Sequence, residues 1–523
     1  MNKNYFTNGT IPKEFKIDKC VDCRHILIDG SLLNCVGKVQ QVNAPIYTKN
    51  SLGKLGPTHL GSVPNVNKKE TLKALTAALH AYDNGKGAWP TMSLETRMTC
   101  VSDFLVAFKA KKAEIVKLLM WEIAKPKAEA EDEFDRTVNY IKNTLKFLNS
   151  KAYKADNLIF TEGVYAQINN APLGVVLCMG PYNYPLNEAF CLLIPALLMG
   201  NTCIYKPAPH GVLCIATLLE AFKNSFPKGV INIVFGSGHT VAAPLLKTGR
   251  IDVLALIGNS KAANALLGLH PKPNRLKLVL GLEAKNAAVV FADADVALAV
   301  KECVLGSMAF NGQRCTAIKI LFVHKSIIKA FNKKFIELIE DLKYGLPWED
   351  GVRLTPLPEP NKPKFIKELI KDATLKGAKI LNEKGGQNFQ NFVFPAVLFP
   401  VNSKMRIFNE EQFGPVVPIV SFDKIDEVIK AVENSNYGQQ ISLFSKNIEK
   451  LKPYINIFGN QVSRVNINSK CQRGPDILPF VGRKDSAVST LGVIDALKTF
   501  SLQTILASKE QNNSKESIKK IFK

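Results

Sequence analysis

One cysteine in this 523-residue chain lies among residue types that could support nucleophilic catalysis. The segment Phe310-Asn-Gly-Gln-Arg-Cys-Thr-Ala317 places Cys315 directly after Arg314, where a predicted helix gives way to a predicted strand. The thiolate is the reactive form of cysteine, and nearby positive charge or oriented backbone N–H groups lower its pKa. A single cysteine beside an arginine is more often structural, so this segment alone is a weak indication of a nucleophile.

Three further segments carry residue types that suit acyl or nucleotide chemistry. Asn183, between Pro181 and Pro185, presents an amide donor that could stabilise a developing oxyanion. Lys206 ends a predicted strand, at the sheet edge where α/β folds bind nucleotides. Gly236-Ser-Gly238 follows a strand and opens a helix, where a phosphate can approach the backbone closely. This glycine pattern is equally compatible with an ordinary tight turn.

Two sets of alternating strands and helices must position these residues. Short apolar runs bounded by Gly or Pro alternate with helical stretches between Gly174 and Leu269, and a second set begins near Asn286. Such alternation with short connections predicts parallel sheets that are covered on both faces. A helical pattern over residues 68–150 precedes both sets, and residues 1–60 are expected to be an irregular, turn-rich lead-in.

The order and spacing of these segments, together with Glu410-Glu-Gln-Phe-Gly-Pro415, resemble the aldehyde dehydrogenase superfamily from about Lys68 to about Ser508. The resemblance implies an α/β fold with a Rossmann-like parallel-sheet cofactor domain, a second α/β catalytic domain and a small β oligomerisation arm. It also implies that Cys315 attacks an aldehyde carbon and that Asn183 and the Cys315 backbone N–H hold the oxyanion. After hydride transfer, a glutamate would activate water to hydrolyse the thioester.

The general base is where the sequence departs from that superfamily. The family usually has Glu-Leu-Gly-Gly-Lys, whereas this chain has Leu280-Gly-Leu-Glu-Ala-Lys-Asn286, so Gly281 occupies the usual position of the glutamate. Glu283 lies two residues later, and a shift of two keeps a strand residue on the same face of its sheet. Glu283 is therefore the expected base, and the alternative is a structural glutamate with weakened deacylation.

The resemblance further implies NADP as the cofactor, with NAD possible. Family members that prefer NAD often carry an acidic residue three positions after the lysine that ends the strand, and Pro209 stands there in this chain. Without that acid a 2′-phosphate is not repelled, and Lys206 can attract it. The alternative is that Pro209 only begins the next helix. The resemblance assigns the remaining cofactor contacts to Gly236, Gly258, Glu411 and Phe413.

Arginines on the motif segments bear on the substrate. Arg136, Arg314 and Arg473, with Tyr184, resemble the residues that hold the substrate phosphate in NADP-dependent, non-phosphorylating glyceraldehyde-3-phosphate dehydrogenases of this superfamily. That resemblance implies oxidation of D-glyceraldehyde 3-phosphate to 3-phosphoglycerate without phosphate incorporation. The alternatives are another small or anionic aldehyde, a deacylation-impaired or silent family member, and a merely structural pairing of Arg136 with Asp132.

Composition narrows the range of partners. The net charge of +23 invites a nucleic-acid or membrane-surface interpretation, but the excess consists of dispersed lysines, 57 against 11 arginines. No nucleic-acid-binding signature and no apolar run long enough to span a membrane occurs, so neither partner is expected. Eleven dispersed cysteines and an N-terminus without a signal-peptide pattern indicate a cytoplasmic protein. Cys20, Cys23, His25 and Cys35 have zinc-like spacing, but no second pair follows, and no metal site is expected.

These observations predict a domain organisation. Residues 61–149 and 171–285 would form the cofactor-binding domain and residues 286–490 the catalytic domain. Residues 150–170, with a strand from Leu158 to Ile168, would join residues 491–508 in the oligomerisation arm, and the resemblance implies a homodimer or homotetramer. Residues 1–60 would be an N-terminal extension, and the basic tail, residues 509–523, is expected to be disordered.

Overall fold

Short apolar runs bounded by glycine or proline become the central strands of the first sheet, as the sequence pattern predicts. A computed structural model describes residues 11–49, 54–150, 153, 158–511 and 514–521. Within these residues, eight strands pair in the order β24-β12-β11-β8-β9-β10-β2-β3. The five parallel strands at its centre are β8 (Val175–Met179), β9 (Thr202–Lys206), β10 (Ile231–Ile233), β11 (Val253–Ile257) and β12 (Lys277–Gly281).

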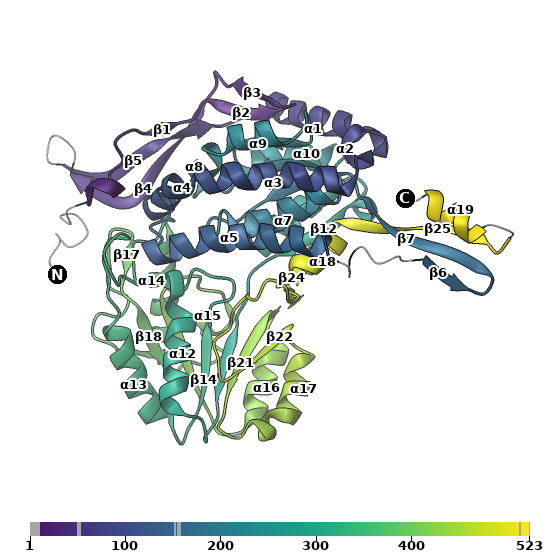
Figure 1. Cartoon of the computed structure of the whole chain (residues 1–523). Helices are drawn as coiled ribbons and strands as arrows, with labels where there is room; N and C mark the ends of the chain where they lie inside the picture. The colour runs from purple at the N-terminus through teal and green to yellow at the C-terminus, as the bar shows by residue number, and fades with distance from the viewer. Residues whose placement is uncertain (1–10, 50–53, 151–152, 154–157, 512–513, 522–523) are drawn as a thin grey trace.

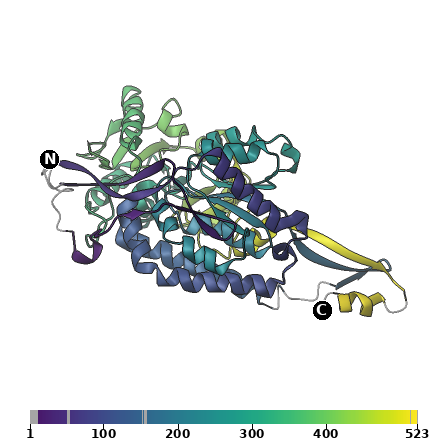
Figure 2. The ribbon, with the colours of Figure 1, turned by 90° about the horizontal axis from the view of Figure 1, so that it is seen from above.

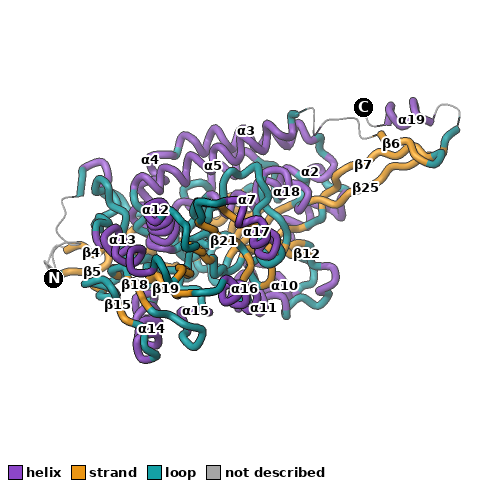
Figure 3. The backbone as a smooth tube through the Cα atoms, turned by 90° about the horizontal axis from the view of Figure 1, so that it is seen from below, coloured by secondary structure: helices purple, strands orange, loops and turns teal. Residues whose placement is uncertain are grey.

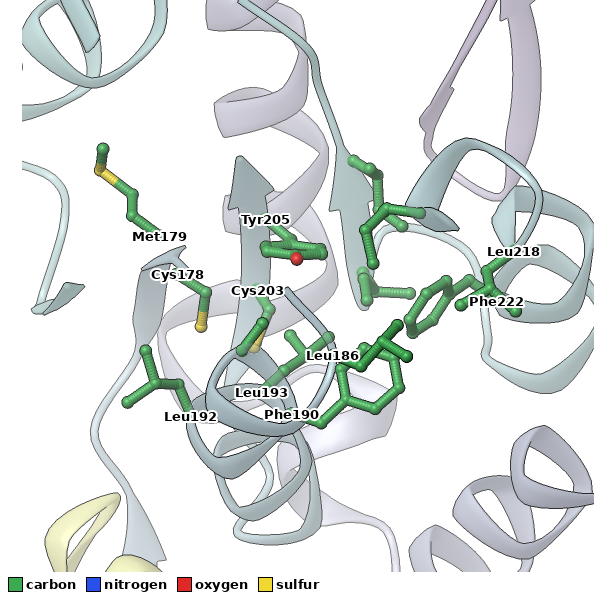
Figure 4. Close-up of a cluster of buried hydrophobic side chains, with 14 of the residues drawn as sticks. Cys178, Met179, Leu186, Phe190, Leu192, Leu193, Cys203, Tyr205, Leu218 and Phe222 are labelled. Atoms are coloured by element: carbon green, nitrogen blue, oxygen red, sulfur yellow. The ribbon is translucent and has the colours of Figure 1, made fainter. Parts of the chain in front are cut away.

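Helix α7 (Asn187–Leu198) covers one face of this sheet. All of its residues are buried, as expected for a helix that is apolar on every side. It packs between the sheet and the helices α3 (Leu94–Ala110) and α5 (Lys127–Leu148). Figure 4 shows Phe190 of α7 close to Phe222, whose ring centroid lies 6.1 Å away. This packing fixes the start of α7, which follows the predicted Asn183 segment directly.

Residues near the N-terminus form strands, so the expectation of an irregular lead-in is wrong for the described part. The strands β2 (His25–Ile28) and β3 (Ser31–Asn34) form an antiparallel hairpin that extends the first sheet beside β10. Its turn is Asp29-Gly30, with φ of 52° and 68°, a sequence typical of tight hairpins. The strands β4 (Val39–Lys49) and β5 (Leu55–Pro64) form a second antiparallel pair. The prediction overlooked the buried apolar residues Ile26, Leu27 and Ile28 of β2.

The cysteines of this region donate to the backbone. The thiol of Cys23 lies 3.4 Å from the His25 carbonyl oxygen, and that of Cys35 lies 4.0 Å from the Leu33 carbonyl oxygen. In the part of the chain that the structure describes, no three His, Cys, Asp or Glu side chains come together as a metal-binding group.

The second sheet carries the Cys315 segment. Over the described residues, seven strands pair in the order β15-β18-β19-β14-β13-β21-β22, below the first sheet in Figure 1. Its central strands are β13 (Ala287–Val290), β14 (Ile320–His324), β19 (Val416–Phe422) and β21 (Gln440–Phe444). Helix α12 (Val296–Met308) begins where Asp295 accepts hydrogen bonds from two backbone N–H groups. The architecture is therefore the predicted one: two mainly parallel α/β sheets and a separate β arm.

The arm is a sheet of β6 (Leu158–Thr161), β7 (Val164–Pro172) and β25 (Ser501–Lys509). The predicted single strand over residues 158–168 is thus a hairpin, which turns at Glu162 and Gly163 with φ of 51° and 74°. Figures 2 and 3 show β7 and β25 extending together to one side of the molecule. Strands from distant parts of the sequence therefore build this element.

The basic tail contains a helix, which contradicts the expectation of disorder there. Helix α19 (Ser514–Ile521) lies beside β7 and β25, and Ile518 is buried. The rest of the tail beyond residue 511 lies outside the described residues. None of the described helices is long and apolar enough to cross a membrane.

Candidate active site

A cavity of about 550 Å³ lies at the carboxyl ends of the parallel strands of the first sheet, where α/β folds bind ligands. Met179 and Lys206 line it from the last positions of β8 and β9, and Glu283 lines it just beyond β12. Of the residues predicted for the site, all except Gly236 line this cavity: Arg136, Asn183, Tyr184, Lys206, Pro209, Gly258, Glu283, Arg314, Cys315, Glu411, Phe413 and Arg473.

Three residues with left-handed backbone lie between the end of α12 and Cys315, which lines the cavity. Phe310, Asn311 and Gly312 have φ of 46°, 55° and 74°. A Cβ on Gly312 would lie 2.8 Å from two backbone carbonyl oxygens, so this position requires glycine. Left-handed residues other than glycine each cost on the order of 1–3 kcal/mol, and such strain gathers at functional sites.

The peptide of Cys315 is anchored by its carbonyl group. The carbonyl oxygen accepts hydrogen bonds from Asn286 Nδ2 at 2.7 Å and from Lys319 Nζ at 3.0 Å. No acceptor for the Cys315 backbone N–H is found among the described residues, which leaves this donor for a ligand. Burial raises the pKa of the Cys315 thiol, and the positive charges of Lys319 and Arg314 oppose this only in part. The neighbouring arginine therefore does not by itself produce a thiolate.

Asn183 is tied to the cysteine segment by its side chain. Asn183 lies in the segment between β8 and α7, and its side chain is buried. The Nδ2 of Asn183 donates to the Gln313 carbonyl oxygen at 2.8 Å. A primary amide has two N–H groups, so one remains for a ligand. The free N–H groups of Asn183 and Cys315 are the kind of donor pair that stabilises an oxyanion.

Glu283 reaches the cavity from a loop. Strand β12 ends at Gly281, so the prediction that Glu283 shares a strand face with that position is wrong. Its Oε2 accepts hydrogen bonds from Ser260 N at 2.8 Å and Ser260 Oγ at 2.6 Å, at the start of α11 (Ser260–Leu267). A carboxylate is favoured there by the helix dipole.

Glu283 differs from the other cavity carboxylates in its partners. No ion pair of Glu283 is found within the described residues. The other four carboxylates on the cavity are each held by a cation: Glu188 by Arg473, Glu359 by Lys362, Glu410 by Arg406 and Glu411 by Lys319. Glu283 is therefore the one of these five carboxylates without an ion pair, and its Oε1 has no partner among the described residues.

The nucleotide side of the cavity contains a buried lysine. The ammonium of Lys206 donates to the Pro207 carbonyl oxygen at 2.8 Å, and burial lowers its pKa to about 8. No carboxylate contributes to that shift, which agrees with the absence of an acid at Pro209. Glu411 Oε1 accepts from Lys319 Nζ at 2.5 Å and from the Ala284 N–H at 3.1 Å. Its Oε2 has no partner among the described residues and can accept from a ligand hydroxyl.

Gly236 lies outside the cavity. A Cβ at this position would lie 2.9 Å from Thr240 Oγ1. Glycine is needed here because the following helical turn begins so close to the backbone of residue 236. The Ser237 side chain accepts from the Thr240 N–H at 3.1 Å and begins this helical turn. This local packing supports the tight-turn alternative for the Gly236-Ser-Gly238 pattern.

Two of the three predicted arginines are paired with carboxylates. Arg136 forms a bidentate pair with Asp476, at 2.7 and 3.0 Å, rather than with a residue of its own helix. Arg473 donates from Nη1 to Glu188. Its Nε lies 3.6 Å from Asp476 Oδ1, beyond hydrogen-bonding distance, and its Nη2 is buried without a partner in the described structure. Burial and the neighbouring Arg136 lower the pKa of Arg473 to about 10, which leaves it charged at neutral pH.

Arg314 lines the cavity without an ion-pair partner among the described residues. Across the described residues it forms no ion pair, and its Cζ lies 5.8 Å from the ring centroid of Tyr184. Burial raises the pKa of the Tyr184 hydroxyl, so this group stays a neutral donor. Arg314, Tyr184 and the spare donors of Arg473 form a site that suits an anion.

Sequence reasoning missed the residues that orient these groups. Asp476 and Lys319 stand three and four positions after Arg473 and Cys315, a proximity that could have suggested their roles. Glu188 pairs with an arginine 285 positions away, which no local pattern predicts. Tyr182 donates to Glu359 at 2.9 Å across 177 positions.

Comparisons with known proteins agree with this arrangement. The model of the "Aldehyde dehydrogenase family" matches residues 54–505. An NADP-dependent glyceraldehyde-3-phosphate dehydrogenase of Pisum sativum is 31% identical over 82% of this chain and 86% of its own length. The crystal structure of an enzyme with the same name from Bacillus halodurans, complexed with NADP, has a TM-score of 0.84 at 31% identity and covers 93% of this chain and 99% of its own. A lactaldehyde dehydrogenase of Methanococcus aeolicus is 25% identical over 86% of this chain and 95% of its own length.

Proposed function

Because the chain belongs to the aldehyde dehydrogenase family, we propose that it oxidises D-glyceraldehyde 3-phosphate to 3-phosphoglycerate with NADP, without incorporating phosphate. The observation that carries the proposal is the convergence of Arg314, Arg473 and Tyr184 on the cavity that also holds Cys315. A phosphate monoester needs several oriented donors, and guanidinium groups supply them in fixed geometry.

The acylation step rests on the cysteine and its two donors. The Cys315 thiolate attacks the aldehyde carbon and forms a thiohemiacetal, whose oxyanion accepts from Asn183 Nδ2 and the Cys315 N–H. NADP, when bound, would supply the hydride acceptor, and oxidation of the thiohemiacetal carbon would leave a thioester on Cys315. Because burial raises the thiol pKa, a proton must leave Cys315 before attack.

Deacylation requires a base for water. Glu283 would take the proton through its Oε1, because Oε2 is occupied by the two donors of Ser260. The water oxygen then attacks the thioester carbon, and the carbon–sulfur bond breaks with its electron pair on sulfur. The acid leaves, and Cys315 is regenerated as the thiolate. No phosphate enters this sequence, so the product is the free carboxylic acid.

The surroundings of Lys206 fit an NADP 2′-phosphate. Lys206 has one carbonyl acceptor for its three N–H groups, so it has donors to spare. No acidic side chain shifts its pKa, so none stands where it would repel a phosphate. A bound dianion would also offset the burial that lowers the pKa of Lys206.

A second candidate is the oxidation of another small or anionic aldehyde. Glu188 and Asp476 already pair with Arg473 and Arg136, so these arginines could serve the structure alone. The likeness to a lactaldehyde dehydrogenase points in the same direction. Impaired deacylation is the third candidate, favoured by Gly281 at the usual position of the glutamate.

Turnover assays with both cofactors separate these candidates. We expect glyceraldehyde 3-phosphate to be oxidised faster than lactaldehyde or succinate semialdehyde, with NADP preferred over NAD and no effect of inorganic phosphate. Arg473→Ala should raise the KM for the phosphorylated aldehyde roughly 10- to 100-fold, because a charge-assisted hydrogen bond is worth about 1.5–3 kcal/mol. The exposed Arg353→Ala is the matched control. An unchanged KM in Arg473→Ala would favour the second candidate.

We also propose that the arm joins subunits into a homo-oligomer. Strand β25 presents Leu502 and Ile505, exposed to 62% and 64%. Large exposed apolar residues on one strand often mark an interface. Light scattering should find a dimer or tetramer, and Leu502→Glu with Ile505→Glu should release monomers. A monomeric parent protein would contradict the proposal.

A further inference from the structure

We propose that the buried ion pair of Lys125 and Glu133 is a positioning device for the oxyanion donor Asn183, and therefore sets the rate of thiohemiacetal formation. The inference rests on the proposed role of Asn183. Neither residue belongs to the nucleophile, the base or the anion site. Neither lines the cavity, and both side chains are fully buried beneath it.

Lys125 holds the segment of Asn183 from one side. Its ammonium donates to the Asn183 backbone carbonyl oxygen at 2.7 Å and to Glu133 Oε2. The same ammonium lies 3.6 Å from the ring centroid of Tyr184 and 4.7 Å from that of Phe310. One buried cation thus contacts the oxyanion residue, its neighbour and the start of the Cys315 segment.

Glu133 holds the same segment from the other side. Its Oε1 accepts from the Leu186 N–H at 3.0 Å and the Asn187 N–H at 3.4 Å. These groups lie at the start of α7, which has no side-chain cap of its own. Glu133 therefore caps a neighbouring helix and fixes the backbone three residues after Asn183.

The pair spans the short stretch that must be rigid. Lys125 fixes the carbonyl of residue 183, and Glu133 fixes the N–H groups of residues 186 and 187. The Asn183 amide can then point in one direction, toward Gln313 and the cavity. A misplacement of about 1 Å in such a donor can cost about 100-fold in rate.

Stability alone is a poor explanation for this pair. Taking two charges out of water is costly, and replacing a buried pair by apolar residues of similar size is often neutral or stabilising. Its hydrogen bonds are instead directed at the main chain of the segment that carries the oxyanion donor Asn183. That arrangement favours a role in positioning the Asn183 side chain.

The test measures the first turnover separately from folding. Glu133→Gln keeps the size of the side chain, and Lys125→Met with Glu133→Gln removes both charges. In stopped-flow experiments with NADP and either glyceraldehyde 3-phosphate or propionaldehyde, we expect the burst of NADPH to slow about 10- to 100-fold in both variants. The KM for NADP and the rate of Cys315 alkylation by iodoacetamide should stay within about twofold, because neither depends on the oxyanion donor.

A matched control comes from α5 and the helix that precedes Lys125. Lys112 of α4 (Lys112–Glu122) pairs with Asp135 of α5 at 2.7 Å on the exposed surface. Lys112→Met with Asp135→Asn should leave the burst unchanged. A slowed burst in this control would mean that any disturbance of α5 slows acylation, and it would overturn the inference.

A double-mutant cycle with Asn183→Ala decides how the pair acts. If the pair acts through Asn183, Glu133→Gln slows the burst in the parent protein but not in the Asn183→Ala background, whereas its effect on Tm is the same in both. Equal slowing in both backgrounds, or a full-speed burst in Glu133→Gln, would overturn the inference. If Asn183→Ala itself has a full-speed burst, the proposed role of Asn183 fails and the inference fails with it. If the parent protein oxidises propionaldehyde but not the phosphorylated aldehyde, only the proposed substrate is wrong.

Discussion

Replacing Glu283 by glutamine tests the least conventional part of the proposed mechanism. Glutamine keeps the length of the side chain, and its carbonyl oxygen can still accept from Ser260 N and Oγ, which lie 2.8 and 2.6 Å from Glu283 Oε2. The start of α11 should therefore stay capped. Only the ability to accept a proton from water is lost.

The magnitude follows from what the carboxylate contributes. General-base catalysis is worth about 10²- to 10⁴-fold, which corresponds to about 3–5 kcal/mol of barrier. The remaining cavity carboxylates are each held by a cation, which favours their charged form and disfavours their taking up a proton in place of Glu283. We therefore expect steady-state turnover of Glu283→Gln to fall by at least about 100-fold.

A burst experiment separates the two half-reactions. Glu283→Gln should release one NADPH per active site at the parent rate and then stop, with the acyl group retained on Cys315 and detectable by mass spectrometry. Glu410→Gln, a cavity carboxylate held by Arg406, is the matched control and should turn over normally. Steady turnover in Glu283→Gln at the parent rate would refute the assignment. Loss of the burst itself would assign Glu283 to acylation or folding.

Three further predictions concern the cofactor, the pH dependence and the core. Pro209→Glu should raise the KM for NADP about 10-fold and leave that for NAD unchanged, because a carboxylate would face the 2′-phosphate; equal effects on both cofactors would contradict this. Burial raises the pKa of Glu122 to about 8, so the stability contributed by its protonated form is fully present below the unfolded-state pKa and is lost as the pH rises through about 8. Glu122→Gln should therefore gain Tm relative to the parent between about pH 5 and pH 8, and a constant Tm difference would argue against it. Phe104→Ala should lower the free energy of unfolding, measured with denaturant, by about 3–5 kcal/mol, because the buried ring stacks on Phe222 with ring centroids 4.3 Å apart. A decrease below about 1 kcal/mol would show that the core closes around the cavity.

Local pattern predicted the elements that depend on near neighbours in sequence. The strands β8, β9 and β11 follow from apolar runs between glycines and prolines, and the start of α12 follows from Asp295. The hairpin of β2 and β3 was equally local, signalled by Asp29-Gly30 and by the apolar residues Ile26, Leu27 and Ile28, but the prediction overlooked it. The helix α19 was also missed by local pattern, because its sequence is mostly charged. It packs against the rest of the molecule through the buried side chain of Ile518.

The candidate site also has a part that depends on near neighbours in sequence and a part that depends on tertiary contacts. The sequence alone determined which residues could do chemistry, because Cys315, Asn183 and Lys206 stand in segments whose turns, strand ends and glycines depend on short-range backbone geometry. Only the tertiary structure decided how those residues are charged and held. Arg136 meets Asp476 across 340 positions, the Lys125–Glu133 pair meets the Asn183 segment, and burial outweighs the nearby cations in setting the pKa of Cys315. Charge and polarity act through space over a few ångströms, so they depend on neighbours that folding brings together from distant parts of the chain.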